Sequence, residues 1–280
     1  MLVGLGLCAG PRAMAGIAQD HFFTTSDGVR LHYTLAGPPG AHTIVLVPGW
    51  TMPGWIWDRQ VQAFSRRYRV VAFDPRAQGE SQIAPSGYEP GRRGQDIAEL
   101  IATLGPQPVL LVGWSLGVLD VLAYVHQHGD ARLAGLVLVD NSVGENPPPT
   151  PSRTPYHPGP HLPREVMMRN FVRGMFARRQ PAAWLDRLTR AALRTPQAIA
   201  NALLAYPVPR TYWKDAVYST DKPVFYIVRP KFAGQAANLA AHHKDAETVV
   251  LHNIGHALFV DDAPRFDTLV QDFIRRRVWR

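Results

Sequence analysis

Residues 109–117 read Val109-Leu110-Leu111-Val112-Gly113-Trp114-Ser115-Leu116-Gly117. The first four residues form an apolar run typical of a buried strand, and a G-x-S-x-G turn then leads into a helix-like segment. A serine on such a strand-to-helix turn exposes its hydroxyl, because small flanking residues let the backbone turn without side-chain clashes. Ser115 is therefore a candidate nucleophile, although five residues alone also fit an ordinary turn.

Short apolar strands alternate with helical segments over most of the 280-residue chain. This alternation predicts an α/β fold with a mostly parallel central sheet flanked by helices. We expect strands at residues 21–24, 29–34, 43–47, 69–73, 109–112, 136–139, 224–228 and 248–251, and helices at 57–64, 94–104, 116–128 and 263–277.

One segment breaks the alternation. Residues 144–218 begin with a proline-rich run and then become helical, which indicates a cap inserted into one core domain made of residues 16–143 and 219–280.

Polar side chains follow three of the predicted strands. In a parallel sheet, reactive groups gather at the carboxyl ends of the strands, so the residues just beyond each strand are informative. Ser115 follows one strand, Asp140 follows the next along the chain, and His256 follows the last. An ordinary turn at Ser115 does not account for this order of serine, acid and histidine.

The three residue types divide the chemistry of acyl transfer. His256 would take the proton of the Ser115 hydroxyl and return it to the leaving group, because imidazole titrates near neutral pH. A buried carboxylate would orient the ring, and Asp140 is chosen partly by elimination, since no acid follows strand 224–228 until Asp245; Glu145 is the fallback. The backbone N–H groups of Trp50 and Leu116 are the expected donors to the developing oxyanion.

These residues resemble the α/β-hydrolase superfamily of serine hydrolases with a helical cap. The matching pieces are Gly113-Trp114-Ser115-Leu116-Gly117, Pro48-Gly49-Trp50, Asp74-Pro75-Arg76-Ala77-Gln78-Gly79-Glu80-Ser81 and Gly255-His256, and the likeness runs from about residue 21 to the end of the chain. The chain departs from the family at Pro48, where His is usual, and at Ala77, where Gly is usual. It also lacks the acid that carboxylesterases of the similar pimeloyl-ester type carry after the penultimate strand.

A serine at the elbow suits acyl transfer, whereas relatives that open epoxides or displace halide use an aspartate there. We therefore expect a serine hydrolase that cleaves a carboxylic ester of a small to medium, fairly hydrophobic substrate. A cofactor-free perhydrolase of the haloperoxidase type and a carbon–carbon bond hydrolase would use the same residues. A homologue that only binds a ligand under the cap is a further alternative.

Candidate substrate-binding residues are aromatic or sulfur-containing. Trp50, Trp114, Met168 and Phe171 are expected to line an acyl pocket, although tryptophans beside a sheet and methionines at helical spacing also serve as core. No metal or cofactor is expected, because the neighbouring His242 and His243 point in different directions on a helix.

The formal net charge of +8 comes from arginine, since only four of the 30 basic residues are lysines. The arginines are scattered rather than gathered in a basic stripe, which argues against a nucleic-acid partner. A small-molecule ester is the expected partner.

The N-terminal segment has features of an export signal. Residues 2–9 are apolar and Ala13-Met14-Ala15 offers a small-x-small cleavage pattern, so residues 1–15 are interpreted as a signal peptide. The run is too short to span a membrane, so no stable insertion is expected. Cys8, the one cysteine, would leave with the leader. Secretion or a periplasmic location follows if the leader is genuine, and a cytoplasmic location if it is not.

Overall fold

A computed structural model describes residues 18–148 and 162–280. The predicted leader and most of the proline-rich run lie outside these residues. The described chain forms one sheet in the spatial order β1-β2-β4-β3-β5-β6-β7-β8. Its strands are β1 (Gln19–Thr24), β2 (Arg30–Ala36), β3 (Thr43–Val47), β4 (Arg69–Asp74), β5 (Val109–Trp114), β6 (Leu133–Val139), β7 (Val224–Val228) and β8 (Ala246–Val250).

The sheet is parallel except at one edge. β1 pairs antiparallel with β2 and β2 with β4, whereas β3 to β8 pair in parallel. The chain moves from β3 to one side for β4 and to the other side for β5, so the direction of winding reverses between β3 and β5. Open α/β sheets bind ligands in the crevice outside such a reversal.

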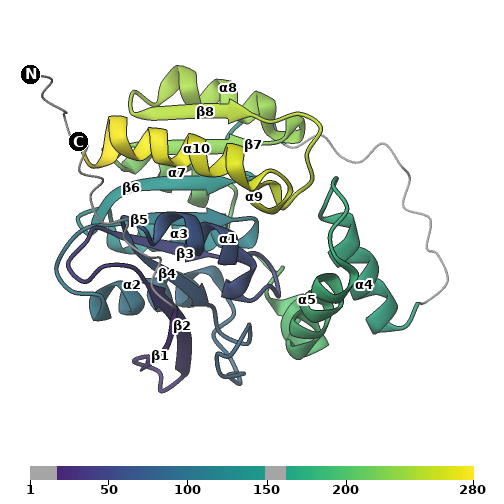
Figure 1. The fold of residues 1–280 in the computed structure, drawn as a ribbon. Helices are drawn as coiled ribbons and strands as arrows, with labels where there is room; N and C mark the ends of the chain where they lie inside the picture. Colours follow the sequence, from purple (N-terminus) through teal and green to yellow (C-terminus); the bar gives the residue numbers. More distant parts are fainter. Residues whose placement is uncertain (1–17, 149–161) are drawn as a thin grey trace, which may run out of the picture.

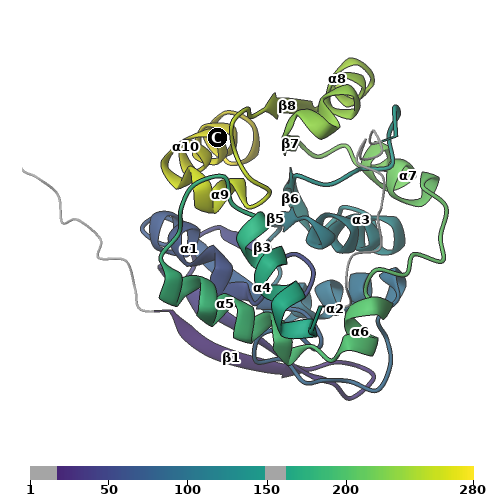
Figure 2. The ribbon, with the colours of Figure 1, turned by 90° about the vertical axis from the view of Figure 1, so that its right-hand side faces the viewer.

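Helices cover both faces of the sheet (Figure 2). On one side lie α1 (Asp58–Phe64), α9 (Leu258–Asp261) and α10 (Ala263–Phe273), and on the other lie α2 (Pro90–Thr103), α3 (Leu116–His128), α7 (Thr211–Ser219) and α8 (Ala233–His242). Short 3₁₀ turns precede α1 and α8, namely η1 (Gly54–Trp57) and η2 (Pro230–Phe232), and a π-helical turn, η3 (Ile274–Val278), follows α10. The predicted α/β-hydrolase architecture is confirmed.

Alternation along the strands produces two hydrophobic cores. In β3, Val45 and Val47 face the core under α2 and α3, whereas Ile44 and Leu46 face the core under α1 and α10. Burial on both faces explains why these strands read as continuous apolar runs rather than as alternating patterns.

The described part of the segment between β6 and β7 supplies four helices. They are α4 (Arg164–Gly174), α5 (Ala182–Arg194), α6 (Gln197–Ala202) and α7. Figure 1 shows α4 and α5 beyond the end of the sheet to which the strand arrowheads point. α7 instead packs on α3, at the side of the sheet. α4 and α5 therefore cover the carboxyl ends of the parallel strands.

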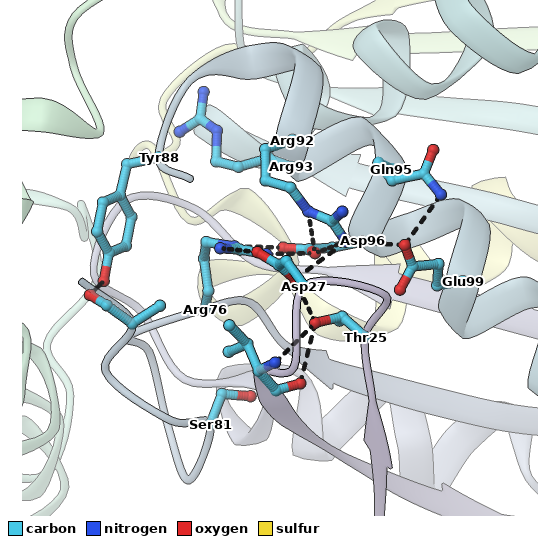
Figure 3. Close-up of polar contacts among 12 residues, drawn as sticks. Thr25, Asp27, Arg76, Ser81, Tyr88, Arg92, Arg93, Gln95, Asp96 and Glu99 are labelled. Atoms are coloured by element: carbon cyan, nitrogen blue, oxygen red, sulfur yellow. Dashed lines mark hydrogen bonds and ion pairs between the residues drawn. The ribbon is translucent and has the colours of Figure 1, made fainter. Parts of the chain in front are cut away.

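The loop after β4 is anchored by a buried arginine (Figure 3). Arg76 is fully buried and holds Asp96 of α2 through two bonds, from Nε (2.6 Å) and Nη2 (2.7 Å). Its Nη1 also reaches Asp27, in the turn between β1 and β2, at 3.2 Å. Paired arginine donors fix the loop in position because the guanidinium is planar and its donors point in set directions.

Ala77, the next residue, has φ of 63°. This left-handed conformation explains why glycine is usual at that position, since a Cβ there costs about 1–2 kcal/mol. Among the helices of residues 18–148 and 162–280, none is both long and apolar enough to cross a bilayer.

Candidate active site

Ser115 sits in a tight turn between β5 and α3. Its φ of 55° is rare for a residue with a Cβ and marks local strain. The turn closes tightly because Gly113 has no side chain: a Cβ there would lie 2.4 Å from the carbonyl oxygen of Gly117. The Ser115 N–H donates to the Val139 carbonyl at 2.9 Å, which ties the turn to β6.

His256 lies in the loop between β8 and α9. Its Nε2 is 2.8 Å from Ser115 Oγ, and its carbonyl accepts from Trp114 Nε1 at 2.9 Å. The carboxylate of Asp261 accepts the N–H of Gly255 at 2.7 Å and also that of Ala177, between α4 and α5. Asp261 thereby links the histidine loop to the cap.

Asp140 follows β6 and completes the line of polar contacts. Its Oδ2 is 2.6 Å from His256 Nδ1, and its side chain is fully buried. Burial raises the pKa of the Asp140 carboxyl, but the hydrogen bond and charge of His256, together with Arg229, outweigh burial and leave the pKa below its usual value. Asp140 therefore stays ionised at neutral pH and can stabilise an imidazolium.

Glu145, the fallback acid, belongs to a different cluster. Its carboxylate binds Tyr218 Oη at 2.5 Å and Lys214 Nζ at 3.1 Å, and it has no contact with His256.

Arg229 follows β7 and contacts both Asp140 and His256. Its N–H donates to Asp140 Oδ1 at 2.9 Å and its Nε to Asp140 Oδ2 at 2.6 Å. Its Nη2 lies 3.3 Å from His256 Nδ1. The residue after β7 is thus a cation that shares the acid with the histidine.

The turn after β3 approaches the serine closely. A Cβ on Gly49 would lie 2.9 Å from Ser115 Cβ, so Gly49 lets the backbone of this turn reach the elbow. Leu116 begins α3, where the first N–H groups have no acceptor within the helix. The backbones of Trp50 and Leu116 are thus both placed next to Ser115.

Gln78 holds the Trp50 turn through its buried side chain. Its Nε2 donates to the carbonyls of Gly49 (3.1 Å) and Met52 (2.9 Å), and its Oε1 accepts the Thr51 N–H at 2.9 Å. Gln78 lies two residues after the anchored Arg76, so the ion pairs in Figure 3 also position this clamp.

A cavity of about 490 Å³ opens above Ser115. Trp50, Phe171, Met175, Leu204, Tyr206 and Phe232 give it apolar or aromatic surface, and Asn141, Arg229 and Lys231 add polar groups. The Trp50 ring meets Phe171 of α4 edge to face at 5.1 Å, and its Nε1 donates to the Ala200 carbonyl of α6 at 2.7 Å. The cap therefore forms part of the cavity wall.

A model of the alpha/beta hydrolase family matches residues 44–267. The chain belongs to this family. The match includes the elbow, Asp140 and His256, and both termini of the chain lie outside it.

Curated relatives of this α/β-hydrolase include a non-heme haloperoxidase of Rhodococcus erythropolis, 35% identical over 42% of the chain and 43% of the relative. A bifunctional esterase/perhydrolase of Acinetobacter calcoaceticus is 34% identical over 52% of the chain and 51% of the relative. The chain thus matches about half the length of these relatives.

Similar solved structures include an esterase from Rhodococcus, with TM-score 0.76 and 23% identity over 92% of the chain and 99% of that structure. A bromoperoxidase from Bacillus anthracis has TM-score 0.76 and 20% identity over 92% of the chain and all of that structure. At this identity, these likenesses concern the fold.

Two of the expected substrate-binding residues do not line the cavity of this α/β-hydrolase. Trp114, the last residue of β5, is 1% exposed and packs edge to face on Phe259 at 5.1 Å. Met168 is 5% exposed and belongs to the same core. Met175, the residue just past the end of α4, lines the cavity instead of Met168.

Two residues at this site had no role assigned from the sequence. Arg229 and Gln78 each stood in a segment singled out for other reasons, the first beyond a strand and the second in the loop after β4. Position beyond a strand could have flagged Arg229, but nothing in the sequence indicates the contacts of Gln78. Within the described residues, no cluster of three or more His, Cys, Asp or Glu side chains could hold a metal ion.

Proposed function

We propose that this α/β-hydrolase is a serine hydrolase that cleaves a carboxylic ester through an acyl-Ser115 intermediate. The observation that carries the proposal is the continuous line of contacts from Ser115 Oγ to His256 Nε2 (2.8 Å) and from His256 Nδ1 to Asp140 Oδ2 (2.6 Å). This arrangement allows a serine to lose its proton as it attacks, with the carboxylate orienting the ring and stabilising the imidazolium.

The first half of the reaction forms the acyl-enzyme. Ser115 Oγ bonds to the ester carbonyl carbon while His256 takes its proton, and the carbonyl oxygen becomes an oxyanion bound by the N–H groups of Trp50 and Leu116. His256 then gives the proton to the departing alcohol oxygen as the carbon–oxygen bond breaks. Donors held in place beforehand lower the barrier because they need not reorganise during the reaction.

In the second half, a water molecule replaces the alcohol. His256 removes a proton from the water as its oxygen attacks the acyl carbon, and returns the proton to Ser115 Oγ when the acid leaves. Hydrogen peroxide attacking in place of water would give a peracid. The names of the relatives from Rhodococcus and Acinetobacter favour perhydrolysis as the second activity of the same acyl-enzyme.

A fluorophosphonate probe tests the proposal directly. The folded protein is treated with the probe, digested and analysed by mass spectrometry, and we expect one covalent label, on Ser115. Ser115→Ala is the matched control and should remain unlabelled. A folded wild-type protein that takes up no label at Ser115 refutes the proposal. Comparing acid and peracid formation from one ester, with and without hydrogen peroxide, then separates the two activities.

A further inference from the structure

The wall of the cavity above Ser115 carries more positive than negative charge. Two of its lining residues, Arg229 and Lys231, are cations, and one, Asp140, is a carboxylate. The carboxylate is fully buried and already accepts bonds from His256 and Arg229. The excess positive charge therefore faces the space in which a substrate would lie. A cleft lined mainly by one sign of charge focuses the field and attracts ligands of the opposite sign.

Arg229 has donors left over for a ligand. Its Nε and backbone N–H are used by Asp140 and its Nη2 lies 3.3 Å from His256 Nδ1, whereas Nη1 donates to no acceptor among the described residues. The side chain is 30% exposed, at the cavity. The N–H groups of Nη1 are therefore left for a ligand, and a carboxylate is the acceptor that a guanidinium binds in its strongest hydrogen bonds.

Lys231 lies two residues further, in η2, and is exposed. It makes no ion pair with the acids of the described chain, and its Nζ lies 5.3 Å from the centre of the Phe232 ring. The ammonium is therefore free to turn toward the cavity mouth. Trp50, Phe171 and Leu204 supply apolar surface to the same cavity.

We propose that the substrate is an ester that carries a carboxylate, with its hydrocarbon part against the apolar wall and its carboxylate bound by Arg229 and Lys231. This rests on the proposed serine hydrolase function. If Arg229 served only as the partner of Asp140, the cavity would hold no carboxylate site. Substitution of Lys231 would then not change the preference for charged over neutral substrates.

Matched substrates measure the preference for charge. Mono-p-nitrophenyl glutarate is compared with its neutral carboxamide counterpart, which places the test group on the acyl side. 4-Carboxyphenyl butyrate is compared with 4-carbamoylphenyl butyrate, which places it on the alcohol side. We expect kcat/KM to be higher for the anion in one of the two pairs, and the difference to shrink in 0.5 M NaCl because salt screens exposed charges.

Variants of Lys231 show whether the charge is responsible. Lys231→Gln should reduce the anion-to-neutral ratio of kcat/KM by about fivefold, the upper range for a partly exposed ion pair, and Lys231→Glu should reduce it further. Lys231→Arg should retain the ratio. Lys244→Gln is the control for net charge, since Lys244 is 79% exposed and does not line the cavity. Lys244→Gln should leave both the ratio and the rate on the neutral esters unchanged.

A binding measurement separates this proposal from the catalytic one. Ser115→Ala is titrated with monomethyl glutarate and with dimethyl glutarate, and tighter binding of the anion, weakened by Lys231→Glu, supports the carboxylate site without any turnover. Hydrolysis of the neutral esters with no anion preference in either pair overturns the carboxylate proposal alone. If no ester is hydrolysed and Ser115 stays unlabelled, the hydrolase proposal is overturned. Equal binding of monomethyl and dimethyl glutarate would then overturn the carboxylate site as well.

Discussion

Asp140→Asn tests which carboxylate serves His256. Asp140 accepts three N–H groups: His256 Nδ1 and Arg229 Nε at Oδ2, and the Arg229 N–H at Oδ1. An asparagine amide has one oxygen and cannot accept at both positions. With its NH₂ toward His256, the ring must take the tautomer that carries hydrogen on Nε2 and cannot accept the Ser115 proton. With its NH₂ toward Arg229, two N–H groups face each other.

The magnitudes follow from these contacts. A serine enzyme with the wrong histidine tautomer loses about 10⁴-fold in kcat, so we expect a fall of about 10³ to 10⁴-fold in turnover of p-nitrophenyl butyrate. Losing a charge-assisted hydrogen bond to a buried group should lower the free energy of unfolding by about 1.5–3 kcal/mol. The protein should remain folded, because the two side chains that lose the carboxylate, His256 and Arg229, are both partly exposed.

Glu145→Gln is the matched control. Glu145 is also buried, with 1% of the side chain exposed, but it binds Tyr218 and Lys214 instead of His256. We expect its kcat to stay within about threefold of wild type. Steady-state kinetics and denaturant unfolding of both variants decide the matter. The assignment of Asp140 is wrong if Asp140→Asn keeps wild-type turnover while Glu145→Gln loses about a hundredfold or more.

Two further predictions concern the clamp on the Trp50 turn and stability in acid. Gln78→Leu removes three hydrogen bonds to residues 49–52. It should lower kcat by about 10 to 100-fold with little change in KM, because a displaced N–H donor weakens binding of the oxyanion only. An unchanged kcat in steady-state kinetics would contradict this prediction. Burial raises the pKa of Glu145, but Tyr218, the Asn146 N–H and Lys214 lower it to about 2, below the 4.5 of a free carboxyl. The stability that the Glu145 charge contributes is therefore present above pH 4.5 and is lost as the pH falls toward 2. The difference in denaturant midpoint between wild type and Glu145→Gln should therefore be smaller at about pH 3 than at about pH 7, and an equal difference at both would count against it.

The fold could be predicted from the sequence because its central strands are buried on both faces. Residues 43–47 and 224–228 read as continuous apolar runs and form β3 and β7 with those bounds. Boundaries moved where packing extends an element: β6 begins at Leu133, three residues before the apolar run, because its first residues continue the pairing with β5. The packing of α7 on α3 has no local signal, since it depends on how the chain returns from the cap.

The site could be predicted only as far as strand ends determine it. Backbone topology brings Ser115, Asp140 and His256 to one edge of the sheet, and the structure places His256 within hydrogen-bond distance of the other two. The direction of each side chain, in contrast, could not be predicted from the strand ends. Trp50 lines the cavity whereas Trp114 is buried in the core, and no local sequence signal distinguishes the two. The three bonds of Gln78 join residues 26–29 apart in sequence.

The neighbouring positions of Asp140 and Arg229 have a consequence for surveys of the family. β6 and β7 pair in register, with Val139 opposite Ile227, so the residues just past the two strands address the same imidazole. A survey that looks for the catalytic acid only at the position after β7 would find Arg229 in this chain. It would therefore classify the chain as lacking the acid. A survey by distance from the histidine would retain it. A search for the acid in homologues should therefore cover both strand ends, since a residue past either strand can reach the imidazole.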